Sequence, residues 1–105
     1  MSLKWPNKDP DETLDYSIDW SRFLGDATIS SVSWFVDDAD GVKTSISAAE
    51  TVNGIQLVSV TNTNTVATAH LGLGTNNKLY KFTCRITDSN GLVVERTVRL
   101  RVRDK

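Results

Sequence analysis

The sequence predicts an all-β sandwich of about seven antiparallel strands. The first observation behind this prediction is a long hairpin in the last third of the chain, where apolar and polar residues alternate over residues 80–87 and again over 94–103. Because successive side chains of a strand point to opposite faces, this period of two places one set in a core and the other in water. The second is the turn sequence Asp88-Ser89-Asn90-Gly91 between the two halves. The third is the series of shorter alternating segments and turn signals upstream, which is typical of a two-sheet sandwich.

The N-terminal fifth of the chain divides into an arm, a strand and a helical turn. Residues 1–11 are expected to form an extended arm, because Pro6 and Pro10 push the residues before them out of helical space. Alternation then begins at Leu14 and predicts a half-buried strand to about residue 20. Residues 21–25 predict a single helical turn, with a serine to cap it and a glycine to end it.

The middle of the chain predicts several short strands separated by turns. A strand over 28–36 is expected to contain a bulge near residues 30–31, because the apolar residues on either side do not share parity. Residues 42–47 are expected to form a short edge strand, and further strands are expected over 55–61 and 65–71. The organisation expected is therefore an arm over residues 1–11 and one sandwich domain over 12–105.

The inward positions of these strands define the expected core. Tyr80 follows a glycine-rich corner at the start of its strand, and its hydroxyl is expected to bond back across that corner, as the corner tyrosine of immunoglobulin-like domains does. The fold class expected is thus an immunoglobulin-like sandwich. Its expected core residues are Tyr16, Ile18, Trp20, Trp34, Tyr80, Phe82, Cys84, Ile86, Val98, Leu100 and Val102.

Charge is divided unevenly along the chain. Residues 1–52 contain four basic and ten acidic residues, whereas residues 53–105 contain eight basic and three acidic residues. One interpretation is that the two ends of the chain lie side by side, with Asp15 and Asp19 facing Arg99, Arg101 or Arg103 on a neighbouring strand. The other is that one surface of the domain binds a partner.

No motif in the chain specifies a reaction, and no catalytic, metal or cofactor-binding residue is predicted. Cys84 has inward parity and is expected to be a buried small apolar residue, and the lone His70 has outward parity. The acidic run over residues 37–40 lacks the spacing of an EF-hand and is expected to be a solvated turn. Arg99, Arg101 and Arg103 share a face with Lys81 and Arg85, but the sequence pI of about 5.7 argues against a nucleic-acid partner. No apolar run approaches the roughly 18 residues of a membrane span.

The arm is the expected contact surface for a partner protein. Trp5 lies beside Pro6 and has no periodic neighbour, so it either folds back onto its own sandwich or anchors a partner chain, as interface aromatics do. The candidate interface residues are Trp5, Pro6, Lys8, Asp9, Pro10 and Asp11.

A family resemblance covers most of the chain, including the final strand, and its specific part is carried by three segments of about residues 4–34. The arm reads Lys4-Trp5-Pro6-Asn7-Lys8-Asp9-Pro10-Asp11-Glu12, the next strand and turn read Leu14-Asp15-Tyr16-Ser17-Ile18-Asp19-Trp20-Ser21, and Leu24-Gly25-Asp26-Ala27-Thr28-Ile29 and Trp34 follow. These segments resemble a tailed-phage virion family described as fibre–tail adaptors or tail-associated immunoglobulin-like proteins. The resemblance implies a non-enzymatic structural role in the virion of a phage or prophage, assembled in the bacterial cytoplasm, with other tail proteins as partners and without a membrane.

A second function class stays open at this stage, namely a stand-alone module that recognises a carbohydrate or a cell-surface polymer. An exposed aromatic platform on one sheet face would favour that alternative, and the inward parity of the strand aromatics counts against it. The sequence leaves undetermined which virion proteins are contacted, the copy number and homo-oligomeric state, any contact with a host receptor, and whether residues 36–69 carry a binding surface.

Overall fold

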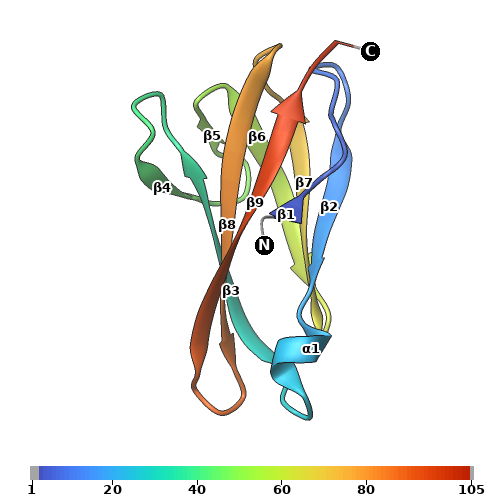
Figure 1. Ribbon diagram of the computed structural model, residues 1–105, viewed down its shortest axis with the longest axis vertical. Helices are drawn as coiled ribbons and strands as arrows, with labels where there is room; N and C mark the ends of the chain where they lie inside the picture. Colours follow the sequence, from blue (N-terminus) through green and yellow to red (C-terminus); the bar gives the residue numbers. More distant parts are fainter. Residues whose placement is uncertain (1–2, 105) are drawn as a thin grey trace.

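A computed structural model describes residues 3–104, which form two packed β-sheets and one short helix (Figure 1). One sheet has five strands in the order β1-β9-β8-β3-β4, and the other has four in the order β2-β7-β6-β5. The elements are β1 (Leu3–Lys4), β2 (Leu14–Asp19), α1 (Ser21–Leu24), β3 (Ile29–Asp37), β4 (Lys43–Ile46), β5 (Thr51–Val52), β6 (Ile55–Asn62), β7 (Val66–Leu73), β8 (Lys78–Asp88) and β9 (Val93–Val102). The all-β prediction is confirmed, and the strands beyond the expected seven are β1 and β5, which have two residues each.

The five-stranded sheet is built around the predicted hairpin. Strands β8 and β9 pair from Lys78↔Val102 to Thr87↔Val93, and β3 pairs antiparallel with the other side of β8. The register of that second pair shifts between Ile29 and Ser31, so the expected bulge is confirmed. At the edges, β4 pairs with β3 and β1 runs parallel to β9.

Turn chemistry follows the sequence in most places. Asn53 and Gly54 both adopt positive φ, at 54° and 84°, and reverse the chain between β5 and β6. Gly25 has a φ of 58° and ends α1, as expected. The expected serine cap is wrong, because Ser21 is the first helical residue and its N–H is accepted by the Asp19 carboxylate at 2.9 Å.

The core lies between the two sheets and contains all eleven residues expected there. Trp34 is buried on β3, and Tyr80 is buried at the start of β8. The Tyr80 hydroxyl accepts the Thr75 N–H at 2.9 Å and donates to the Asn53 carbonyl at 2.8 Å. This is the corner hydrogen bond expected of an immunoglobulin-like sandwich, and it also joins the β7–β8 corner to the β5–β6 turn.

Two expectations about the ends of the chain are wrong. Strand β2 does not lie beside β9, since it pairs with β7 in the other sheet and places Asp15 opposite His70. The arm, expected to be an extended contact surface for a partner, instead lies between β9 and β2 and is hydrogen-bonded to β9 (Figure 1). The expected arm and domain limits at residues 1, 2 and 105 lie outside the described residues.

Candidate protein-interaction surface

Trp5, the expected anchor for a partner, belongs to the core of its own domain. Its side chain is only 7% exposed, and its ring centroid lies 4.9 Å from that of Tyr16 and 5.7 Å from that of Phe82. Its backbone N–H donates to the Arg99 carbonyl on β9 at 2.9 Å, and its indole N–H donates to the Ser17 carbonyl on β2 at 3.2 Å. One residue therefore joins the two sheets. Of the two interpretations of Trp5, the structure supports folding back.

Lys8 is also buried, with none of its surface exposed. Its Nζ donates to the Leu73 carbonyl at 2.5 Å and to the Asp9 carbonyl at 2.9 Å. Its backbone continues the pairing with the last strand, because its N–H donates to the Arg101 carbonyl and its carbonyl accepts the Arg103 N–H at 2.7 Å. Lysine is rarely fully buried, and here carbonyl oxygens replace part of its hydration. Lys8 therefore holds the arm in place and offers no surface to a partner.

The other four candidate interface residues lie at the surface around a small turn. Pro6 and Asp11 are exposed, whereas Asp9 and Pro10 are partly buried. The Asp9 carboxylate accepts the Asp11 N–H at 2.8 Å. These residues can lie at the rim of a protein interface, but the expected aromatic anchor, Trp5, is buried in the core of its own domain.

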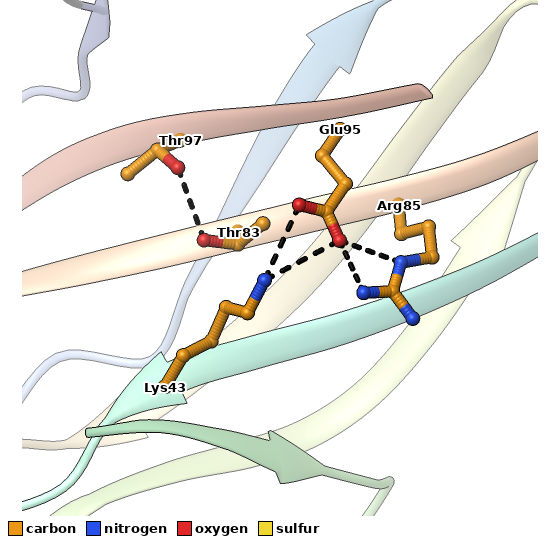
Figure 2. A network of polar contacts seen from close by, with 5 residues as sticks. All are labelled: Lys43, Thr83, Arg85, Glu95 and Thr97. Carbon is orange, nitrogen blue, oxygen red and sulfur yellow. Dashed lines mark hydrogen bonds and ion pairs between the residues drawn. The ribbon is translucent and has the colours of Figure 1, made fainter. Parts of the chain in front are cut away.

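A larger ordered surface lies on the outer face of the five-stranded sheet (Figure 2). There Glu95 of β9 is positioned between Arg85 of β8 and Lys43 of β4. Its carboxylate accepts the Arg85 Nε–H at 2.6 Å and forms ion pairs with the Arg85 guanidinium and, at 3.2 Å, with Lys43 Nζ. These hydrogen bonds, that from Arg85 above all, hold the pKa of Glu95 below its usual range.

Phe35 of β3 completes this cluster from below the two cations. The Arg85 guanidinium carbon lies 4.7 Å from the centre of the Phe35 ring, and Lys43 Nζ lies 5.3 Å from it. Both are cation–π distances. Phe35, Lys43, Arg85 and Glu95 are called the outer-face cluster below. Sequence reasoning missed it, although the outward parity of Phe35 beside the inward Trp34 was a visible signal.

The residues beside the cluster make this part of the sheet rigid. The hydroxyls of Thr83 and Thr97 bond each other across β8 and β9 at 3.1 Å (Figure 2). Thr83 is buried although it belongs to the outer face. The cluster thus sits on paired strands rather than on a loop, which limits its loss of freedom on binding.

A band of basic residues adjoins the cluster on the same face. The predicted sharing of a face is confirmed by pairing, because Lys81 lies opposite Arg99 and Arg85 lies opposite Glu95. The two ion pairs of this face both involve Glu95. The members of this basic band are Lys4, Lys81, Arg99, Arg101 and Arg103.

The remaining candidate sites have structural explanations. The Asp38 carboxylate accepts the N–H groups of Asp40 and Val42 at 2.9 Å each, and these bonds, the one from Val42 first, lower its pKa. Within residues 3–104 no group of three or more potential metal ligands is found. Cys84 is fully buried, and burial raises the pKa of its thiol to about 12. In the described part of the chain no helix is long and apolar enough to cross a membrane.

A hollow of about 190 Å³ opens between β4 and β6, on the side of the sandwich away from the arm. Its floor includes Trp34, Ile46 and Leu57, and its rim includes Val60 and several serines. No aromatic platform accompanies it. Of the eight aromatic side chains, six are buried, Phe35 is half-buried under its two cations, and only Phe23 is exposed.

The fold is thus that of the all-β, two-sheet class of immunoglobulin-like sandwiches, with an ordered charged cluster on its outer face. Comparison with protein families identifies that class more closely. The chain belongs to the family described as podophage GP4 fiber-tail adaptor protein gp77, whose model matches residues 8–101. A comparison with curated proteins finds no match. The family resemblance read from the sequence is thereby confirmed, and the match also includes the middle segment.

Proposed function

We propose that this chain is a non-enzymatic structural protein of a phage or prophage that links the tail fibre to the tail. The observation that carries the proposal is the family match over residues 8–101, which spans nearly the whole sandwich. Its partners would be other tail and virion proteins, without nucleic acid or membrane. Its place would be the virion, after assembly in the cytoplasm of the host.

The outer-face cluster is the surface we assign to a partner. Arginine and aromatic side chains are enriched at protein interfaces and dominate their hot spots. Here Phe35 and Arg85 are stacked at 4.7 Å and are held by Glu95, so much of the ordering cost of a contact is met before binding. A partner that covers this cluster would also remove its ion pairs from solvent and strengthen them.

The test compares incorporation into particles with folding. Phe35→Ala and Arg85→Glu each alter the cluster, whereas Thr61→Ala alters an exposed position on the four-stranded sheet and serves as the control. Each variant is produced during infection or prophage induction, and its amount in purified particles is measured by mass spectrometry. Thermal melting of each purified variant shows whether it is folded.

We expect the two cluster variants to remain folded and to fall at least about tenfold in particles, since losing a hot spot of 1.4 kcal/mol or more changes binding by that factor. The Thr61→Ala control is expected at the wild-type level. Folded cluster variants that enter particles as well as wild type would overturn the assignment of this surface. Absence of the wild-type protein from particles would overturn the adaptor function itself.

A further inference from the structure

The two sheets of this sandwich carry opposite charge, and the structure keeps those charges apart. The strands of the four-stranded sheet contain two acidic residues, Asp15 and Asp19, and no lysine or arginine. The outer face of the five-stranded sheet carries the basic band and the two cations of the outer-face cluster against two acidic residues, Glu95 and Asp37. The charges carried by the strands therefore differ in sign between the two layers of the fold.

The acidic residues lie on a surface that another molecule can reach. Strand β2 is the last strand of its sheet, and the arm covers its free edge through Trp5, but Asp15 and Asp19 point outward from the sandwich. Both Asp15 and Asp19 are exposed, and no ion pair within residues 3–104 involves either of them. The Asp19 carboxylate accepts the Ser21 N–H, which lowers its pKa and keeps it charged. We call Asp15 and Asp19 the acidic edge.

The spacing of the acidic edge matches that of the basic band. Asp15 and Asp19 are four residues apart on one strand and share its outward parity, so they lie about 13 Å apart along it. Arg99 and Arg103 are also four residues apart, and the bond from the Arg103 N–H to the arm keeps the chain extended there. Two carboxylates and two guanidiniums at equal spacing can pair simultaneously, with Arg101 and Lys81 beside them.

We propose that the acidic edge of one copy of this chain docks on the basic band of a second copy. Because the two surfaces differ, the contact is head-to-tail, and a bound pair still offers one free acidic edge on one copy and one free basic band on the other. Such a contact propagates into a ring or a row of copies. The inference rests on the proposed function in one respect, since it takes the outer face of the five-stranded sheet as a contact surface.

The contact would be weak between free molecules and strong in a particle. Exposed ion pairs are screened by salt, whereas copies held side by side by another tail component meet at a high effective concentration. The measurement is therefore made on concentrated full-length protein, at about 0.5 mM, by sedimentation equilibrium at about 50 mM and 500 mM salt.

Charge reversal tests the pairing directly. The edge variant carries Asp15→Lys and Asp19→Lys, the band variant carries Arg99→Glu and Arg103→Glu, and a combined variant carries all four changes. A control with Asp26→Lys and Asp40→Lys has the same change in net charge as the edge variant, at exposed loop positions. Particle content of the band variant is measured in parallel.

We expect wild type and control to self-associate, at least about tenfold more tightly at the lower salt. The edge and band variants are expected to be monomeric, and their equimolar mixture and the combined variant are expected to associate again. A monomeric wild type at low salt, failure of the combined variant to associate, or equal loss in the control would overturn the inference. A monomeric wild type whose band variant still drops out of particles would overturn this inference and leave the proposed function standing, with a different acidic surface as partner. If wild type is monomeric and binds duplex DNA through the band, the occupant is a polyanion and not a second copy.

Discussion

The sandwich has two sides along which edge strands of its two sheets face each other, and these two sides differ. On one side, the edges of β9 and β2 are joined by the arm, with Trp5 bonded to both strands and packed on Tyr16 and Phe82. On the other side, β4 and β6 are separated by a hollow of about 190 Å³, and Val60 at its rim is 42% exposed. The arm side is sealed by a large aromatic residue from outside the main strands, whereas the open side has only short residues at its rim.

This difference decides where a partner can bind. A residue that closes the core cannot leave it for a partner without exposing Tyr16, Phe82 and the edge of β9 to water. The arm therefore contributes to stability, and the contact function falls to the outer sheet faces, where ordered side chains remain accessible.

The largest expected effect comes from removing the Trp5 side chain, which closes the arm side. Trp5→Ala deletes a buried aromatic that contacts three other core rings, and such a change costs about 3–5 kcal/mol. The melting temperature should fall by more than about 10 °C in a domain of this size. Val60→Thr on the open side is the control, and its effect should stay within about 0.5 kcal/mol because Val60 is already exposed. If Trp5→Ala melted within about two degrees of wild type, the arm side would not be sealed by this residue.

The second prediction concerns the buried amine that holds the arm. Lys8→Met keeps most of the apolar stem but removes the donor to the Leu73 and Asp9 carbonyls, at a cost of about 1–3 kcal/mol. Urea denaturation should show this loss as a lower midpoint with an unchanged slope. Lys81→Met, at an exposed position, should change the midpoint little. Equal stability of the two methionine variants would mean that the Lys8 bonds contribute nothing.

The third prediction compares the corner tyrosine of β8 with the tyrosine beneath the arm. Tyr80→Phe removes a hydroxyl that bonds both Thr75 and Asn53, the latter at the turn before β6, and should cost about 1–2 kcal/mol. Tyr16→Phe, beneath Trp5, removes a buried hydroxyl without a partner among the described residues and should be neutral or stabilising. Thermal melting of both variants measures these two changes in stability. A larger loss of stability from Tyr16→Phe than from Tyr80→Phe would contradict the hydrogen-bond assignments of both tyrosine hydroxyls.

Local pattern was enough to predict most of the sandwich. The period of two in residues 80–87 and 94–103 located a hairpin and its inward side chains, because alternation is a property of neighbouring residues. The same reasoning located the bulge near residues 30–31 and the corner role of Tyr80. These features depend on sequence separations of a few residues, where the geometry of a strand or turn is nearly fixed.

The alternation of apolar and polar residues could not predict which distant strands pair with each other. Nothing in the alternation of residues 14–19 distinguishes pairing with β7 from pairing with β9, and the attraction between acidic and basic ends suggested the wrong one. The arm has prolines and no period, so the burial of Trp5 and Lys8 left no periodic signal. Each residue of the outer-face cluster has outward parity. Predicting that they meet would have required the register of β4, β3, β8 and β9 together.

The smallest expected effect tests how the open side is braced. Lys43 lies on β4, the edge strand of the open side, and its ion pair with Glu95 reaches across to β9. Glu95→Gln should therefore increase amide hydrogen exchange in residues 43–46 and leave the amides of Trp5 and Lys8 unchanged. The stability difference should be small and should shrink in high salt, because the side chains of Lys43, Arg85 and Glu95 are 47%, 41% and 34% exposed.

The dependence of this effect on pH has a definite sign. The pKa of Glu95 is lowered in the folded protein from the ordinary value of 4.5, mainly by the hydrogen bond from Arg85. A carboxyl with a depressed folded pKa contributes stability that is complete above the unfolded pKa and is lost as pH falls through the folded pKa. The difference between wild type and Glu95→Gln should thus be present at neutral pH and vanish in acid. A difference that persists unchanged into acid, or faster exchange on the arm side instead of on β4, would show that the cluster does not brace the open side.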